Sequence, residues 1–448
     1  MPVSAFHSNR AIIKGMIMEA TIIVEDGLIL EVVEGRSSYA GASYVEAGDN
    51  ILMAGIIDPH VHLNEPGRTE WEGFETGTKA AIAGGITSLV EMPLNASPVT
   101  TTTLAFDEKL AAASGKLYAN CGFWGGIVPG NAKEIIPLAK KGILGFKAFL
   151  THSGIDEFPN VSEEDLNIAM PLVAETGLPL LVHCELSDPS ADTEKHSSRS
   201  YQQYLASRPG VWEDAAISMM IRLCEKHGCR VHIVHLSSAT AIASIKAAKA
   251  KGLPLSVETA QHYLYFNAEE IEDGNTSFKC APPIRELANN EQLWKALKEG
   301  TIDFVATDHS PAPPALKEIK SGDFMKAWGG ISSLQLSLPI LWTAAKKHGC
   351  QVVDISKWLC EKPAILAGLQ HRKGKLEKGF DADFVIWDPG RNFIVDGNAL
   401  QHKHKLTPYH GQPLFGVVHE TYVSGKKIFG NGYFTGVRNG EVIYRDYS

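Results

Sequence analysis

The chain has 448 residues, of which 44% are hydrophobic and 21% charged, so it can form a full-sized core and more than one globular domain. Its net charge of -9 argues against a binding surface for nucleic acid or for an anionic membrane. No stretch is apolar for long enough to span a bilayer, and we expect neither nucleic acid nor a membrane as a partner.

The cysteines and the first residues predict where the protein works. The seven cysteines are scattered, lack paired metal spacing and are expected to be reduced thiols. Residues 1–7 show no basic region followed by an apolar core, so we expect no secretory signal. Both features predict a cytoplasmic protein.

The N-terminal flank is typical of antiparallel β-structure. Residues 8–50 contain short alternating runs, and residues 20–25 precede Asp26-Gly27, which is a hairpin signal.

The middle of the chain repeats one pattern, in which a short apolar run is followed by a loop and then by a helical stretch. The runs lie at 51–57, 85–92, 118–128, 143–150, 178–183, 230–236, 253–259 and 302–307. Helices are expected at 70–83, 102–114, 131–141, 163–176, 212–227 and 239–251. Strands that alternate with helices indicate a parallel sheet, and eight units fit a (β/α)₈ TIM-like barrel. An open doubly wound sheet is the alternative, and the residues at the strand ends favour the barrel.

The C-terminal flank resembles the N-terminal one. Residues 384–387, 420–423 and 441–444 are short β-like pieces. The simplest arrangement is a small β-sandwich built from residues 1–50 and 370–448, with the barrel, residues 51–369, inserted between them.

The predicted strand ends carry metal-binding side chains. His60 and His62 are two residues apart, so they point to the same side of a strand. Imidazole is the commonest protein ligand for a transition metal, and barrel enzymes place their chemistry at the C-terminal ends of the strands. The later runs end near Lys147, His183, His235 and Asp308. Six such residues at one edge predict a two-metal hydrolytic site.

Each of these residues taken alone has a structural explanation. A single His183 or His235 is more often a hydrogen-bonded core histidine, and Asp308 could cap a helix or a turn. A single Lys147 would usually reach solvent, and its ammonium has no lone pair for a metal. A ligand role for Lys147 requires loss of the proton and gain of a carboxylate, for example by carbamylation, which burial and nearby metal charge would favour.

The motifs around these residues resemble the amidohydrolase superfamily, in its cyclic amidohydrolase branch of allantoinases, dihydroorotases and hydantoinases. The resemblance covers nearly the whole chain. Its motifs are Asp58-Pro59-His60-Val61-His62, Gly145-Phe146-Lys147, Val182-His183-Cys184-Glu185, Val234-His235-Leu236-Ser237, Thr307-Asp308-His309-Ser310-Pro311 and Lys378-Gly379-Phe380-Asp381-Ala382-Asp383-Phe384-Val385.

The resemblance implies two divalent metal ions, usually Zn²⁺, bridged by an N6-carboxylated (carbamylated) Lys147 and by a hydroxide that acts as the nucleophile. It places one metal on His60, His62 and Asp308 and the other on His183 and His235. It implies that Asp308 serves as general base and then as general acid, and that the protein is a homo-oligomer, a tetramer in the family. Histidine and carboxylate ligands also accept cobalt, manganese or iron, so the metal itself stays open.

Within this branch the chain is most similar to the allantoinases, in segments 62–74, 91–95, 122–126, 149–159 and 279–285. This similarity implies a small cyclic ureide substrate and opening of the hydantoin ring of allantoin to give allantoate. Dihydroorotases typically carry an arginine at the position of Asn64, where it pairs with the substrate carboxylate. Asn64 suits a neutral ureido group, although Arg68 is close enough in sequence to compensate.

The strand-end loops are expected to bind the substrate. Hydantoinases usually have a tyrosine at the position of His152, and we expect His152 either to line the pocket or to pack within its loop. Segment 309–330, which contains three prolines, is expected to cover the pocket. The residues expected to contact the substrate are Asn64, Asn95, His152, Cys280 with its neighbouring backbone, Ser310 and Gly330.

Two other functions remain open at this point. One is a dihydroorotase or a hydantoinase/dihydropyrimidinase. The other is a catalytically silent, dihydropyrimidinase-like assembly protein. Such silent relatives commonly lack several metal ligands, whereas all six are present in this chain.

Overall fold

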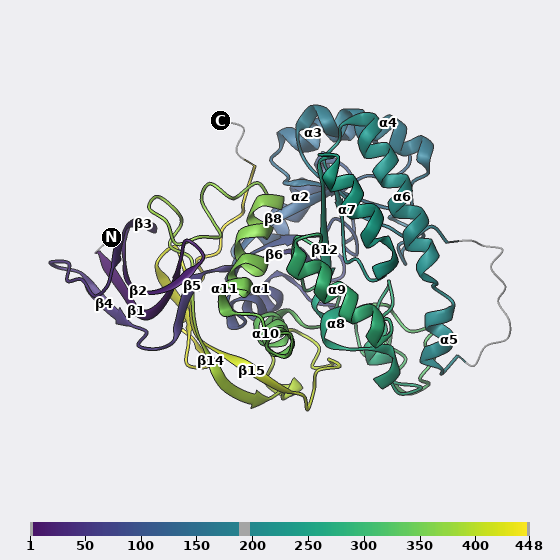
Figure 1. Cartoon of the computed structure of the whole chain (residues 1–448). Coiled ribbons are helices and arrows are strands. Elements are labelled where there is room, and N and C mark those ends of the chain that lie inside the picture. The colour runs from purple at the N-terminus through teal and green to yellow at the C-terminus, as the bar shows by residue number, and fades with distance from the viewer. Residues whose placement is uncertain (1–2, 188–197, 446–448) are drawn as a thin grey trace.

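A computed structural model describes residues 3–187 and 198–445 of the chain. Its centre is an eight-stranded parallel sheet in which the strands follow one another in chain order (Figure 1). The last strand returns to the first through a parallel bridge between Val61 and His309, so the sheet closes into a barrel. The strands are β6 (Ile56–Val61), β7 (Ile86–Glu91), β8 (Asn120–Gly126), β9 (Gly145–Phe149), β10 (Leu180–His183), β11 (Val231–Ile233), β12 (Leu255–Ala260) and β13 (Phe304–Ala306). The predicted eight-stranded barrel is confirmed.

Helices surround this barrel, because the chain must cross over between parallel strands. The helices of the first six units are α1 (Phe74–Ala83), α2 (Thr103–Ala113), α3 (Ile135–Lys140), α4 (Glu163–Thr176), α5 (Tyr201–Ala206), α6 (Gly210–His227) and α7 (Ile242–Ala250). The remaining helices are α8 (Gln261–Tyr265), α9 (Leu287–Glu299), α10 (Ser337–Lys347), α11 (Val352–Ser356) and α12 (Lys362–Leu366). All six predicted helical stretches contain a helix.

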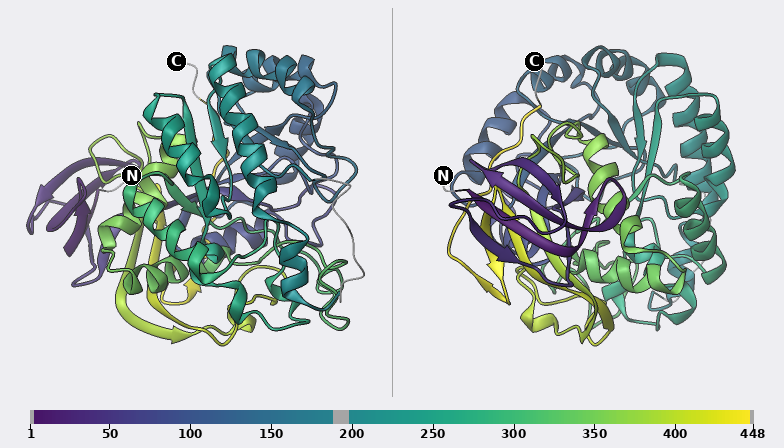
Figure 2. Two further views of the ribbon diagram at one scale, coloured as in Figure 1. Left: turned by 45° about the vertical axis from the view of Figure 1, so that its right-hand side comes forward. Right: turned by 60° about the vertical axis from the view of Figure 1, so that its left-hand side comes forward.

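Both ends of the chain form a second sheet beside the barrel, as predicted. Its strands run in the order β17-β16-β15-β14-β5-β1-β2-β3, with β4 paired to β1. Figure 2 shows the N-terminal strands, in purple, beside the C-terminal strands, in yellow. The bounds are β1 (Ser4–Ile13), β2 (Met16–Glu25), β3 (Leu28–Glu34), β4 (Ser43–Glu46), β5 (Ile51–Ala54), β14 (Phe384–Ile394), β15 (Pro413–Val423), β16 (Lys426–Gly430) and β17 (Tyr433–Phe434).

The terminal sheet curls over its own apolar face. The ring of Phe6 in β1 lies 5.0 Å from that of Phe384 in β14 and 4.9 Å from that of Tyr422 in β15. Neither β14 nor β15 pairs with β1, so these contacts are made across the curled face, as in a β-sandwich.

The boundary between the terminal sheet and the barrel was predicted at residue 51, but it lies at residue 55. Residues 51–57 were expected to form one strand, but β5 pairs with β1 and β14 in the terminal sheet and β6 begins only at Ile56. Gly55 joins the two strands where the chain passes into the barrel. A Cβ there would lie 2.1 Å from Thr87 Oγ1, so the close approach requires glycine.

The last predicted β-piece, residues 441–444, belongs to the barrel rather than to the terminal sheet. The amide of Cys121 in β8 donates to Glu441 O, at 2.9 Å, and the amide of Ile443 donates to Cys121 O, also at 2.9 Å. Strand β9 pairs with β8 only from Trp124 onward, which leaves the first backbone groups of β8 free on that side. The C-terminal segment satisfies them, as buried backbone groups require.

One buried apolar cluster extends through the barrel and the terminal sheet, and includes Ile22, Phe74, Leu180 and Phe384. Within the described ranges, no helix combines the length and the apolar character needed to cross a membrane.

Candidate metal centre

Five of the six predicted metal ligands meet at the C-terminal ends of the barrel strands. His60 lies in β6 and His62 directly follows it, and their ring centroids are 5.7 Å apart. His60 Nε2 lies 3.2 Å from Asp308 Oδ1, and His62 Nε2 lies 3.6 Å from the same oxygen. His60, His235 and Asp308 each offer a donor atom within 4.8 Å of the others.

His183 and His235 form the other half of the cluster. Nδ1 of His183 lies 3.0 Å from Nε2 of His235, and the ring centroids are 4.6 Å apart. The ring of Phe149 stacks on His183, with a centroid separation of 4.6 Å. Two imidazole nitrogens that converge between β10 and the end of β11 offer a pair of ligands to one ion.

Lys147 in β9 is fully buried, and its Nζ has no hydrogen-bond partner among the described residues. The ammonium lies 4.9 Å from the ring centroid of Phe149. Burial lowers the pKa of Lys147 to about 8, although Glu258 and Asp308 favour the charged form. An unpartnered buried amine with a lowered pKa is accessible in its neutral, nucleophilic form.

Burial favours the neutral form of three imidazoles of the cluster. It lowers the pKa of His62 to about 4, and it lowers the pKa values of His183 and His235 as well. A neutral imidazole has the free lone pair that a metal needs. Asp308 is held ionised, because His60, His62 and His235 lower its pKa well below the ordinary value despite its burial. Neutral imidazoles beside an ionised carboxylate fit a divalent metal ion, and we assign the cluster as a divalent metal site.

Two carboxylates orient the histidines from behind. Glu258 in β12 contacts His60 Nδ1 through Oε1 and His232 Nε2 through Oε2, the latter at 3.1 Å. Glu185 Oε2 lies 2.7 Å from His183 Nε2. The contacts with His60 and His183 use the ring nitrogen that faces away from the cluster, which fixes the orientation of both imidazoles.

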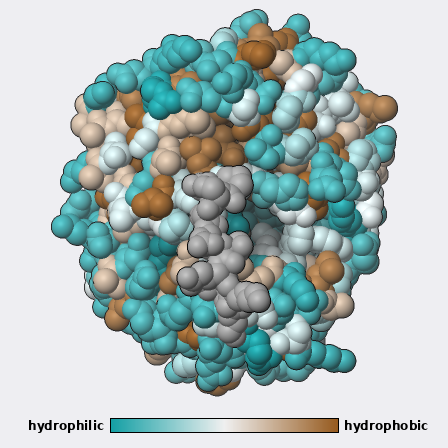
Figure 3. All heavy atoms as spheres, turned by 90° about the vertical axis from the view of Figure 1, so that its right-hand side faces the viewer, coloured by the Kyte–Doolittle hydropathy of each residue, from teal (hydrophilic) through white to brown (hydrophobic). Residues whose placement is uncertain are grey.

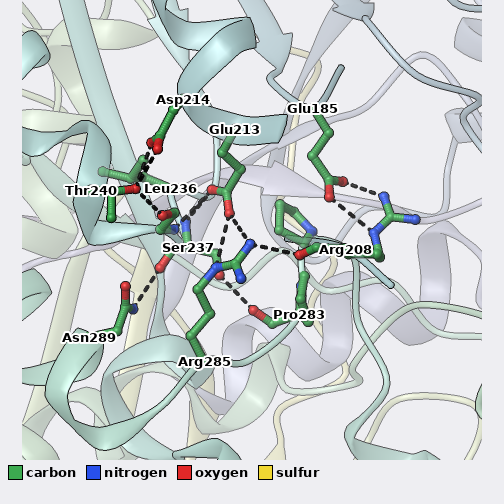
Figure 4. A network of polar contacts seen from close by, with 12 residues as sticks. Glu185, Arg208, Glu213, Asp214, Leu236, Ser237, Thr240, Pro283, Arg285 and Asn289 are labelled. Carbon is green, nitrogen blue, oxygen red and sulfur yellow. Dashed lines mark hydrogen bonds and ion pairs between the residues drawn. The ribbon is translucent and has the colours of Figure 1, made fainter. Parts of the chain in front are cut away.

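Arg208 in turn binds both carboxylate oxygens of Glu185. Nε of Arg208 donates to Glu185 Oε1 at 3.0 Å, and Nη2 donates to Oε2 (Figure 4). Although burial opposes ionisation, Arg208 and His183 lower the pKa of Glu185 to about 2. His183, Glu185 and Arg208 thus form one hydrogen-bonded chain beside the metal site.

The same network supports the loop that follows His235 (Figure 4). Arg285 donates to the carbonyl of Arg208, at 3.1 Å, and to Glu213 Oε1, at 2.7 Å. Glu213 Oε2 accepts the backbone amides of Ser237 and Ser238, both at 3.0 Å. Arg285 therefore connects the contacts that hold His183 to those that hold the loop after His235.

The backbone is strained at two of the ligands. His235 has φ 38° and Asp308 has φ 47°, both in the left-handed region that non-glycine residues rarely occupy. Asp58 fixes the strand ends nearby, because its Oδ1 accepts the amide of His60 at 3.1 Å and its Oδ2 accepts the hydroxyl of Thr307 at 2.5 Å. The first and last strands are thereby tied together at the site.

A cavity of about 830 Å³ lies over the metal ligands and opens on the side of α5, where Figure 3 shows a hollow in the surface. His60, His62, His183, His235 and Asp308 line it, together with four residues expected to contact the substrate. These four residues are Asn95, His152, Ser310 and Gly330.

Asn64 and Cys280 themselves are not among the residues that line the cavity, although both were expected to contact the substrate. The side-chain amide of Asn64 donates to the carbonyl of Pro311, at 3.4 Å, and the residue is fully buried. The carbonyl of Cys280 accepts the hydroxyl of Tyr204, at 2.6 Å. The neighbours of Cys280, Lys279 and Ala281, line the cavity instead.

Several cavity residues were not predicted. Tyr204, Arg208 and Trp212 follow β10, and Trp328 belongs to the segment after Asp308. Tyr204 lies in the short helix α5, Trp212 in the first turn of α6, and Arg208 and Trp328 in loops. At such positions no strand or helix periodicity indicates which side chains face a pocket. Glu258 carried a signal that was overlooked, since a carboxylate inside a buried strand requires a partner.

Comparisons with known proteins agree with this architecture. The sequence profile of the Amidohydrolase family matches residues 51–428. The allantoinase of Streptomyces avermitilis is 46% identical over 429 residues, and the match covers 96% of each chain. The allantoinase of Saccharomyces cerevisiae is 43% identical over 446 residues, again with 96% of each chain covered. Among solved structures, the L-hydantoinase (dihydropyrimidinase) from Arthrobacter aurescens superposes with a TM-score of 0.93 at 30% identity, over 99% of this chain and 100% of that one.

Proposed function

The chain belongs to the amidohydrolase family and, within it, to the allantoinases, and from this premise we propose that it hydrolyses the hydantoin ring of allantoin to give allantoate. It is a cyclic amidohydrolase, and the cluster of buried histidines and Asp308 at the floor of the cavity is where the reaction takes place.

The charges around the cavity favour a neutral substrate. Each lysine and arginine that lines the cavity within the described ranges already has a partner. Arg208 is held by Glu185, Lys279 donates to the carbonyls of Met325 and Ala327, and Lys326 lies 3.7 Å from Asp323. Among these described residues, no cationic fork remains for a substrate carboxylate such as that of dihydroorotate.

Arg68 does not supply that fork either. Its Nη2 pairs with Glu157 Oε1 at 2.8 Å, its Nη1 donates to the carbonyl of Ala96 at 3.3 Å, and it is not among the cavity-lining residues. The lack of an unpaired cation among the described residues at the cavity, together with the similarity to allantoinases, is the reason for proposing allantoin as the substrate.

We propose that two divalent metal ions, zinc by resemblance, occupy the site. His60, His62 and Asp308 would hold one ion, His183 and His235 the other, and carbamylated Lys147 would bridge them. Bound metal lowers the pKa of a water molecule and polarises the scissile carbonyl. The neutral amine of Lys147 would add to carbon dioxide and release a proton, leaving a carboxylate. Its unpartnered Nζ and its lowered pKa support this step.

Asp308 would carry the proton through the reaction. Ser310 Oγ donates to Asp308 Oδ1 at 2.9 Å and helps to fix the orientation of the carboxylate. An ionised, oriented carboxylate can take a proton from the attacking water and pass it to the leaving ring nitrogen. The product carries a new carboxylate where the amide bond was broken.

Parallel assays of the purified, metal-defined protein test the proposal. We expect turnover of allantoin to exceed that of dihydroorotate, hydantoin and dihydrouracil, and Lys147→Ala to lose activity and bound metal together. Turnover of dihydroorotate without turnover of allantoin would overturn the choice of substrate. Carbon-13 NMR of protein equilibrated with labelled carbon dioxide should show a carbamate signal that Lys147→Ala lacks.

We also infer that the chain forms a homo-oligomer, a tetramer by resemblance, in the cytoplasm. Buried free cysteines are compatible with a reducing compartment, and exposed apolar side chains on the terminal sheet, such as Met16, Leu28 and Tyr44, could form an interface. Light scattering of the purified protein measures the number of subunits.

A further inference from the structure

Lys317 is a buried cation without an acidic partner. It lies in the segment that follows the last metal ligand, and the residue is only 4% exposed. Its Nζ donates to three backbone carbonyls, those of Lys279 at 3.0 Å, Trp328 at 3.0 Å and Gly330 at 2.8 Å. Lys317 forms no ion pair with any carboxylate in residues 3–187 or 198–445.

Such an arrangement is costly, because a charge removed from water requires full compensation. Burial, with a smaller contribution from Lys279, lowers the pKa of Lys317 to about 7. The three carbonyls favour the protonated form of Lys317, because they give each N–H of its ammonium one acceptor. A nonpolar residue of similar length would avoid the cost of burying the charge, so the carbonyl contacts indicate a positioning role.

The carbonyls bound by Lys317 belong to a wall of the substrate cavity. All six residues of the segment 325–330, here called the wall segment, line that cavity. The wall segment contains no helix or strand, so it lacks the regular hydrogen bonds that fix the rest of the barrel. Its shape depends on individual contacts instead.

A second lysine holds the other end of the wall segment. Nζ of Lys279 donates to the carbonyl of Met325, at 3.2 Å, and to that of Ala327, at 2.5 Å. Two further backbone bonds join the same pieces of chain, from Gly330 N to Lys279 O at 2.9 Å and from Trp328 N to Leu316 O at 2.7 Å. Two ammonium groups therefore bind four carbonyls of the six-residue wall segment.

We propose that Lys317, assisted by Lys279, is a positioning residue that shapes the substrate cavity through the wall segment and so sets the affinity for the substrate and the ring substituents that fit. Lys317 does not contact the reacting atoms, so its effect falls on substrate binding more than on the chemical step. The inference rests on the proposed function only in the choice of allantoin as the assay substrate.

Lys317→Met tests the proposal, because methionine keeps most of the length of the side chain and removes all three donors. We expect KM for allantoin to rise about tenfold or more, which corresponds to the loss of roughly one net hydrogen bond, while kcat stays within about threefold. The ratio of kcat/KM for allantoin to that for unsubstituted hydantoin should fall, and bound metal per chain should stay unchanged.

A structural readout makes the test independent of activity. Hydrogen exchange of the amides in the wall segment should accelerate in Lys317→Met. If that variant fails to fold, Lys279→Met provides the same readouts, with a smaller rise in KM expected because only two carbonyls are released. Turnover of allantoin by the unmodified chain is measured first and tests the proposed function separately.

Lys373→Met is the matched control. Lys373 is also buried, but it pairs with Asp381 at 2.7 Å and Asp383 at 2.5 Å and does not line the cavity. We expect it to lower the melting temperature without changing KM, substrate preference or exchange in the wall segment. An unchanged KM and unchanged wall exchange in Lys317→Met, or the same changes in Lys373→Met, would overturn the proposal.

Discussion

Three of the histidines in the metal centre use their second ring nitrogen for a contact inside the protein. His60 contacts Glu258, His183 contacts Glu185, and His62 Nδ1 lies 3.3 Å from the side-chain amide of Asn95. Each contact leaves the opposite nitrogen directed at the metal site. The orientation of the ligands is therefore set by residues that do not bind the metal themselves.

Glu185→Gln should weaken metal binding. The amide keeps the shape of the side chain but removes the charge that orients His183 and pairs with Arg208. Loss of such a partner typically costs about 10- to 100-fold in metal affinity. Metal retained per chain after dialysis against graded chelator concentrations, measured by elemental analysis, checks the prediction.

Glu163→Gln is the control for this experiment. Glu163 also pairs with an arginine, Arg222, at 2.9 Å, but this pair lies on the surface. Equal metal retention in Glu185→Gln and Glu163→Gln would contradict a role for Glu185 in holding the metal ligand.

The convergence of the proposed metal ligands was predictable from the sequence, and the convergence of the residues that contact them was not. His60, His62, His183, His235 and Asp308 end apolar runs, and parallel strands bring such ends to one edge of a barrel. Arg208 lies between two helices, and its contact with Glu185 depends on the course of that loop. Loop conformation leaves no periodic pattern in a sequence, so pairs of this kind become visible only in the structure.

At the scale of elements, the segment after Asp308 shapes the cavity through one close approach. A Cβ on Gly330 would lie 2.2 Å from the carbonyl oxygen of Ser310. The hydroxyl of the same Ser310 donates to the Asp308 carboxylate. The chain at Gly330 can approach Ser310, which lies in the segment after β13, only because residue 330 has no side chain.

Gly330→Ala should therefore displace the wall segment. Overpacking of this kind typically costs about 1–3 kcal/mol, and we expect kcat/KM for allantoin to fall at least about tenfold as the cavity changes shape. Gly329→Ala is the control, because a Cβ there meets nothing closer than 3.6 Å. Steady-state kinetics and urea unfolding of both variants measure the effects, and similar kinetics in the two would contradict the prediction.

At the scale of the whole molecule, the C-terminal part packs against the barrel through residues 402–405. The amide of Lys403 donates to the Glu72 carboxylate at 3.0 Å, and the ring of His402 lies 5.5 Å from that of His309. His402 is fully buried, and neither ring nitrogen has a partner among the described residues. Residues 402–405 thus bring a buried, neutral histidine into the contact between the two parts of the chain.

His402 should make the stability of the protein sensitive to acid. Burial lowers the pKa of His402 to about 3, whereas the unfolded chain binds a proton below about pH 6.5. Between these values the unfolded state holds more protons, so the free energy of unfolding decreases as pH falls, by about 1.4 kcal/mol per pH unit. His402→Gln should show a shallower decrease, smaller by roughly 2 kcal/mol at pH 5.

Urea unfolding between pH 7 and pH 5 measures this difference, and any loss of metal in acid affects both proteins alike. His371→Gln, which changes an exposed histidine, should follow the unmodified chain. A slope in His402→Gln equal to that of the unmodified chain would contradict the prediction.

The barrel with a terminal sheet built from both ends of the chain was largely predictable from the sequence, because two β-rich ends that flank a barrel can pack in few compact ways. Two details depended on local pairing. Residues 51–54 join the terminal sheet, and residues 441–443 complete β8. Both are short apolar pieces whose partner could not be chosen from hydrophobic pattern alone.

The sheet shared by both ends of the chain has a consequence for synthesis. One edge of β5 pairs with β1, but its other partner, β14, begins at Phe384, so most of the chain is made before that edge is covered. At about 5–20 residues per second the nascent protein keeps an apolar strand edge open for some tens of seconds. During that interval the edge can pair with another chain, which is the usual route to strand-mediated aggregation. A nascent chain stalled before β14 therefore has the barrel sequence but lacks the strand that covers the edge of β5.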